Sequence, residues 1–210
     1  QTAKELVLTQ GRKLAQKGFR VILPDAANHG ERKTERSPIP SLTFWNSIQS
    51  NLFEFSYIVD FFENLGVTNG QIGVGGVLMG GMTTCGLLTK HPEITAAACI
   101  MGSPAMIKYR ERIQYHASAA GFFLPNDYEA LVSWINDYDL QSQIETLAAR
   151  PLLFWHGTED EKIPYEHVKA FVDQFPQNNI EFISETERHL VKGETMNLVT
   201  DFFEKHLSVE

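Results

Sequence analysis

Two spacings of apolar residues alternate along the chain. Windows with apolar positions three or four residues apart predict helices, whereas short continuous apolar runs bounded by turn residues predict buried strands. The windows with helical spacing are residues 4–17, 42–65, 80–90, 165–175 and 190–206. The runs that predict strands are residues 19–23, 71–75, 95–101, 151–155 and 180–183. Because helices separate the strands, we expect a mostly parallel sheet with helices on both faces.

No repeat, low-complexity tract or linker divides the 210 residues, so we expect a single α/β domain over residues 1–210. The longest predicted helix, residues 42–65, ends at Gly66. Its apolar side chains that we expect to face the sheet are Phe53, Tyr57, Val59 and Phe62.

An irregular helical stretch over about residues 104–149 separates the strands 95–101 and 151–155. Its apolar residues are Met106, Tyr109, Phe122, Phe123, Leu124, Leu131, Trp134 and Ile135. Such a surface is suited to cover an acyl or aromatic group of a ligand. Packing onto the sheet is the simpler role for most of these side chains.

Composition excludes several classes of protein. A net charge of -8 is unfavourable for binding the phosphate backbone of a nucleic acid, so we expect no nucleic-acid partner. No run approaches the roughly 20 apolar residues of a membrane span. The two cysteines, Cys85 and Cys99, lie in apolar runs, which favours a reducing cytoplasmic setting over a disulfide framework. The sequence does not predict the oligomeric state.

Candidate chemistry lies directly after three of the strands, where open parallel sheets bind their ligands. The first stretch, GVGGVLMGGM, starts at Gly73 and places Leu78 in the middle of a glycine-spaced turn between strand and helix. Asp160 follows the strand 151–155, and His189 follows the strand 180–183. Their order along the chain is strand-to-helix turn, acid, histidine.

This order resembles the α/β-hydrolase superfamily, in which the triad runs serine, acid, histidine and the serine lies within G-x-S-x-G. Three stretches add to the resemblance: RPLLFWHG, which starts at Arg150, PD with HGER, which start at Pro24 and His29, and MGSP, which starts at Met101. They are similar to the small bacterial esterases related to dienelactone hydrolases and to prolyl-oligopeptidase catalytic domains. The resemblance implies an α/β-hydrolase fold in which residues 104–149 form the lid.

The same resemblance implies roles for individual residues. Asp160 would be the acid, His189 the base, and the backbone N–H of Met79 one oxyanion donor. Leu78 would occupy the nucleophile position, but a leucine has no proton to lose and no lone pair with which to attack. The substrate would be a small-molecule ester of unspecified identity, without a metal or other cofactor. In this form the serine mechanism cannot run.

Other interpretations compete with this one. The glycines of the turn partly imitate the G-x-G-x-x-G of nucleotide-binding folds, but the third glycine is absent. Thr83, Thr84 and Cys85 are possible substitute nucleophiles, yet they lie in the helix more than a turn beyond Leu78. His167 is expected at the surface.

Two classes of function remain open. The first is a carboxylesterase inactivated by Leu78, and the second is a natural pseudoenzyme that binds a small acyl ligand or a protein partner. A further expectation concerns the first helix, which in the related fold follows several strands and a second oxyanion donor. We therefore expect a natural precursor longer by a few tens of residues.

Overall fold

The computed structural model describes residues 7–176, 179–189 and 191–208. Its helices are α1 (Leu8–Gln16), α2 (Leu42–Asn64), α3 (Met79–Leu88), α4 (Met106–Ala119), α5 (Tyr128–Leu131), α6 (Tyr165–Gln174) and α7 (Gly193–His206). Three short 3₁₀ helices are η2 (Gly30–Arg32), η3 (Ser133–Asp137) and η4 (Leu140–Leu147). The strands are β1 (Ile72–Val77), β2 (Ile94–Ile100), β3 (Leu152–Gly157) and β4 (Ile180–Glu185).

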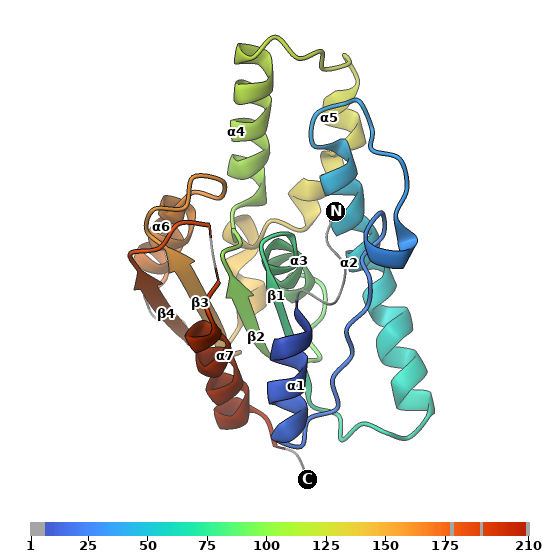
Figure 1. The fold of residues 1–210 in the computed structure, drawn as a ribbon, viewed down its shortest axis with the longest axis vertical. Helices are drawn as coiled ribbons and strands as arrows, with labels where there is room; N and C mark the ends of the chain where they lie inside the picture. The colour runs from blue at the N-terminus through green and yellow to red at the C-terminus, as the bar shows by residue number, and fades with distance from the viewer. Residues whose placement is uncertain (1–6, 177–178, 190, 209–210) are drawn as a thin grey trace.

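The four strands form one sheet in the order β1-β2-β3-β4, and every neighbouring pair is parallel. Helices α1 and α7 lie together on one face of the sheet, while α2 and α3 pack on the other (Figure 1). The prediction of a parallel sheet with helices on both faces is therefore confirmed.

Alternate residues of the central strands enter two separate cores, because successive side chains of a strand point to opposite faces. In β3, Phe154 packs into the core beneath α2, α3 and α6, whereas Trp155 packs into the core beneath α7. Both side chains are completely buried. Burial on both faces explains why β2 and β3 read as continuous apolar runs in the sequence.

The predicted strand over 19–23 is wrong, because this segment forms no sheet ladder in the described structure. The backbone is extended, and burial alternates from Phe19 to Leu23 as in a strand. Leu23 packs against Gly11 of α1, where an added Cβ would lie 2.8 Å from the leucine side chain. A strand needs a neighbouring strand for its backbone hydrogen bonds, and none within the described residues lies beside this segment.

The expected sheet-facing side of α2 is also partly wrong. Phe53 and Tyr57 are 55% and 76% exposed, whereas Ile48 and Leu52 are buried. Leu52 contacts α3 at Gly86, where an added Cβ would lie 3.0 Å from the leucine side chain. Because α2 carries apolar residues on more than one face, its sequence alone does not select the buried one.

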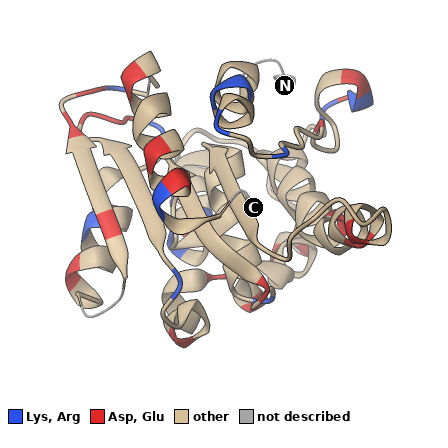
Figure 2. Cartoon of the chain, turned by 90° about the horizontal axis from the view of Figure 1, so that it is seen from below, with Lys and Arg blue, Asp and Glu red and all other residues tan. Residues whose placement is uncertain are grey.

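The connection between β2 and β3 rises from the carboxyl end of the sheet as α4 and returns through α5, η3 and η4 (Figure 1). Strands carry few of the charged residues, which lie mainly on helices and loops (Figure 2). Within the described ranges no helix is both long enough and apolar enough to span a bilayer.

Candidate active site

The turn between β1 and α3 has a strained backbone. Leu78 has φ 58° and ψ -113°, in a region that non-glycine residues rarely occupy. Its N–H donates to the carbonyl of Ile100 at 2.9 Å, and its own carbonyl accepts from the N–H of Met82 at 3.1 Å. Such a conformation costs about 1–3 kcal/mol and persists only where the surrounding structure holds it.

The glycines around this turn allow the strand and the helix to approach closely. A Cβ on Gly76 would lie 2.3 Å from the carbonyl carbon of Gly80, which is impossible without backbone movement. Gly81 and Gly102 form a second close approach, since a Cβ on Gly102 would lie 2.7 Å from the Gly81 backbone. The glycine spacing in the sequence thus reflects two tight backbone contacts, Gly76 with Gly80 and Gly81 with Gly102.

The side chain of Leu78 is partly buried and packs against both hydrophobic cores. Met79 follows it as the first residue of α3, where backbone N–H groups have no acceptor within the helix. A helix N-terminus favours negative charge, so this N–H is chemically suited to an oxyanion.

Asp160 lies in the loop after β3, and its side chain is fully buried. Its Oδ1 accepts hydrogen bonds from the backbone N–H groups of Lys162 at 2.8 Å and Ile163 at 3.0 Å. His189 Nδ1 lies 2.8 Å from Oδ1 and 2.9 Å from Oδ2 of the same carboxylate. The carboxylate therefore holds the ring through Nδ1, which leaves Nε2 as the nitrogen for proton transfer.

The loops that carry Asp160 and His189 are bonded directly to one another. The N–H groups of Thr158 and Glu159 donate to the carbonyls of Glu185 and Glu187 at 2.8 and 3.0 Å. Gly157 makes this approach possible, since a Cβ there would lie 2.3 Å from the Glu187 carbonyl oxygen. Main-chain contacts thus fix the acid loop against the histidine loop.

His156 is a site residue that the sequence reasoning did not single out. This completely buried ring donates from Nε2 to the carbonyl of Ile163 at 2.9 Å, and the same nitrogen lies 3.4 Å from Asp160 Oδ2. Burial lowers its pKa, so the ring is neutral at pH 7. Its position four residues before Asp160, at the end of an apolar strand, is the signal that could have identified it.

His167, expected at the surface, is instead partly buried against the end of β2. Its Nδ1 lies 3.0 Å from Oγ of the fully buried Ser103, which also accepts from the N–H of Ala105 at 3.1 Å. Burial lowers the pKa of His167 to about 4, and the charges of Lys108 and Arg112 act in the same direction. The pattern of α6 did not reveal this contact, because it depends on the path of the β2–β3 connection.

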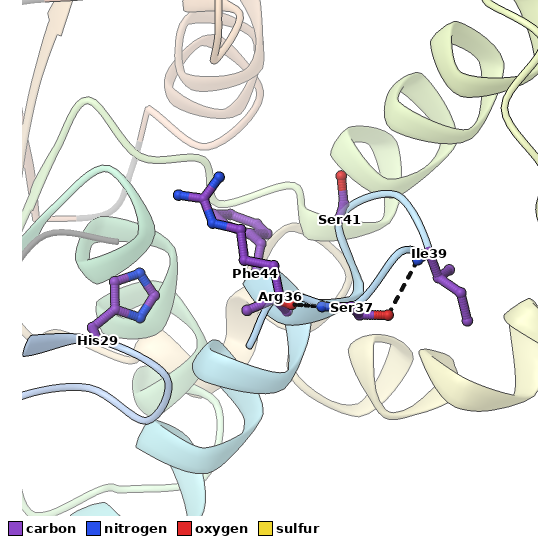
Figure 3. Close-up of a pocket in the computed structure, with 7 residues that line it drawn as sticks. His29, Arg36, Ser37, Ile39, Ser41 and Phe44 are labelled. Atoms are coloured by element: carbon purple, nitrogen blue, oxygen red, sulfur yellow. Dashed lines mark hydrogen bonds between the residues drawn. The ribbon is translucent and has the colours of Figure 1, made fainter. Parts of the chain in front are cut away.

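Two hollows share Ser41. The smaller has a volume of 290 Å³, and Figure 3 shows His29 and Arg36 extending toward the same side of it, with Ile39 at the other end. The larger, of 440 Å³, is named here the α4 groove. Its lining residues are Pro40, Ser41, Tyr109, Arg112, Ile113, His116, Ala117, Ala120, Phe122, Glu161 and Lys162.

Comparison with known proteins identifies the family of the chain. The model of the prolyl oligopeptidase family matches residues 52–210. The chain belongs to this family. Over 98% of its length it is 33% identical to "Putative esterase YitV" of Bacillus subtilis, of which it covers 86%. It is 27% identical to the esterase YjfP of Escherichia coli, over 92% of this chain and 80% of that protein.

Solved structures of related fold include members from two thermophiles. TT1662 from Thermus thermophilus superposes with a TM-score of 0.75 at 17% identity, covering 98% of this chain and 84% of that one. The Pyrococcus furiosus esterase Pf2001 gives a TM-score of 0.62 at 18% identity, covering 93% and 74%. Together with the sequence relatives, they place the chain in an esterase branch of the α/β-hydrolases of the prolyl oligopeptidase family.

Among the described residues, no group of three or more His, Cys, Asp or Glu side chains is arranged to hold a metal ion. Of the proposed substitute nucleophiles, Thr83 and Thr84 donate to the carbonyls of Met79 and Gly80 within α3. These bonds direct both hydroxyls along their own helix.

Proposed function

We propose that this chain is a carboxylesterase scaffold of the serine-hydrolase type in which Leu78 occupies the nucleophile position, so that this form does not turn over esters. The observation that carries the proposal is the conformation of Leu78, with φ 58° and ψ -113° at a strand-to-helix turn. This strained turn serves to expose a nucleophile in the G-x-S-x-G arrangement, and a leucine has no such chemical role. The Asp160–His189 contact of 2.8 Å supports the same proposal.

With a serine at position 78, the roles would follow from ordinary acyl-transfer chemistry. His189 Nε2 would accept the hydroxyl proton while the serine oxygen bonds to the carbonyl carbon of a small ester. Asp160 would stabilise the resulting imidazolium through Nδ1, and the N–H of Met79 would donate to the oxyanion. The proton would then pass to the leaving alcohol, and water would release the acid by the same steps.

The test is introduction of a hydroxyl at position 78. Leu78→Ser is expected to raise hydrolysis of short-chain p-nitrophenyl esters by several orders of magnitude, since loss of a triad serine costs on the order of a million-fold. Leu78→Ala is the matched control, because it removes the leucine side chain without supplying a nucleophile. Adding His189→Ala to the serine variant should abolish the gain. Equal rates for the serine and alanine variants would refute the proposal.

A natural pseudoenzyme that binds a small acyl ligand is the second candidate. It is favoured by the packing of Leu78 against both cores, which is a stable arrangement for an apolar side chain. Acyl-ligand binding by the unaltered chain, together with a serine variant that binds but does not turn over, would support this candidate. The codon at position 78 in the source genome separates a natural leucine from a substituted one.

For its location we propose the cytoplasm, supported by two buried free thiols, Cys85 and Cys99. Fractionation of the source cells tests this proposal, and recovery of the protein outside the cytoplasm would refute it.

A further inference from the structure

The α4 groove follows one face of α4. Tyr109, Ile113, Ala117 and Ala120 line it at spacings of three and four residues, which places them in a row along the helix. At 1.5 Å per residue this row is about 16 Å long. The groove therefore suits an elongated ligand rather than a compact one.

The groove borders the acid loop of the candidate active site. Glu161 and Lys162, which line it, directly follow Asp160 in the acid loop. Tyr109 also lines it, and its pKa is raised by burial and, to a smaller extent, by the negative charge of Asp160. The Tyr109 end of the groove is therefore the end near Asp160, the partner of His189.

Beyond Arg112, most of the α4 residues that line the groove are apolar, with His116 as the polar exception. Ala117 and Ala120 are small residues that line the groove at the end of α4. Phe122 follows just beyond the helix. Phe122 is 62% exposed, so an exposed aromatic ring borders the groove. These features are suited to a hydrocarbon chain.

Two cations that line the groove form no ion pair among the described residues. Within the part of the chain that the structure describes, no carboxylate lies within ion-pair distance of Arg112 or Lys162. Glu161 is the acidic residue among those lining the groove, so the balance is positive in a chain of net charge -8. The positive charge of Arg112 also lowers the pKa of Tyr109, against the effect of burial.

We propose that the α4 groove binds amphiphilic ligands with a linear apolar chain and an anionic group, a carboxylate or a phosphate, near the ester. Arg112 and Lys162 contact the anion, and the row from Ile113 to Ala120 contacts the chain. This inference names the substrate class of the site and rests on the proposed function. A guanidinium and an ammonium at the Asp160 end discriminate anionic esters from neutral ones of equal length.

Binding to the unaltered Leu78 protein tests the inference without any hydrolysis. The probes are octyl phosphate and octanoate, with 1-octanol as the neutral partner and butyl phosphate as the short one, all below micelle-forming concentrations. Titration calorimetry should give both anionic octyl compounds an affinity about tenfold above that of 1-octanol. Butyl phosphate should bind more weakly than octyl phosphate.

Three variants separate the contact with the anion from the contact with the apolar chain. Arg112→Gln and Lys162→Gln should each weaken octyl phosphate binding about fivefold to tenfold and leave 1-octanol unchanged. Ala120→Phe should weaken the octyl compounds but not butyl phosphate, because Ala120 is exposed and a ring there fills the end of the groove away from Tyr109. Arg12→Gln, an exposed charge removal on α1, is the matched control and should change none of these affinities.

Equal affinity for octyl phosphate and 1-octanol, or no effect of Arg112→Gln and Lys162→Gln, would overturn the inference. If octyl phosphate alone binds and octanoate does not, the anion is a phosphate, and the reverse identifies a carboxylate. Turnover of neutral esters by the Leu78→Ser protein without anion preference leaves the proposed function standing and removes the groove inference. Anion-dependent binding without ester turnover in the serine variant supports the groove inference and refutes the proposed function.

Discussion

His156 Nε2 lies 3.4 Å from Asp160 Oδ2 while it donates to the carbonyl of Ile163 at 2.9 Å. The ring therefore bridges both ends of the turn whose N–H groups hold the Asp160 carboxylate. A buried neutral histidine thus contacts both Asp160 and Ile163 of the acid loop, and His189 contacts the same carboxylate from the loop after β4. We infer that His156 is a positioning residue for Asp160.

His156→Phe should destabilise the protein by about 1–3 kcal/mol, because the buried Ile163 carbonyl loses its donor. It should also speed solvent exchange of the His189 Nδ1 proton seen by NMR, since Asp160 is held less firmly. His156→Gln retains a donor and should recover part of both effects. If the phenylalanine variant loses stability while the His189 proton signal stays unchanged, His156 supports the fold and does not position the acid.

Gly76→Ala tests the close approach beneath the strained turn. Its Cβ would lie 2.3 Å from the Gly80 carbonyl carbon, so we expect a loss of about 3 kcal/mol in the free energy of unfolding. Gly80→Ala is the matched control, because a Cβ there meets no atom within 4 Å. Alanine is the better helix former, and this variant should be unchanged or more stable by up to about 1 kcal/mol. Denaturant titration of both proteins makes the comparison, and similar losses would contradict the close contact.

His167 should make stability depend on pH. Its folded pKa of about 4 lies below the ordinary value of 6.5, so between these values the unfolded chain binds a proton that the folded chain does not. The contribution is fully present above about pH 6.5 and is lost as the pH falls toward 4. The largest loss corresponds to about 3 kcal/mol.

Unfolding free energies at pH 7, 5.5 and 4.5 for the unaltered protein and His167→Gln check this expectation. The variant lacks the titrating ring but keeps the carboxylates that titrate in both proteins. The unaltered protein should lose more stability over this range than the variant. Parallel curves would show that the ring is protonated as easily in the folded state as in the unfolded one.

The sequence by itself determined the order of helices and strands and the parallel sheet. These features depend on local spacing: continuous apolar runs such as 95–101 suit strands buried on both faces, and helical windows between them require crossover connections. The positions of Leu78, Asp160 and His189 just after strands follow from the same pattern. Parallel strands bring such residues to one edge of the sheet whatever the details of packing.

Only the tertiary structure decided which segments find partners. Residues 19–23 have the apolar pattern of a strand, but a ladder requires a neighbour that the pattern does not specify. Phe53 and Leu52 are adjacent and similarly apolar, yet only Leu52 meets α3. His156 and His167 depend likewise on backbone carbonyls and hydroxyls from distant segments. A one-dimensional pattern records which side chains avoid water, whereas contact between segments far apart in sequence is settled by packing in three dimensions.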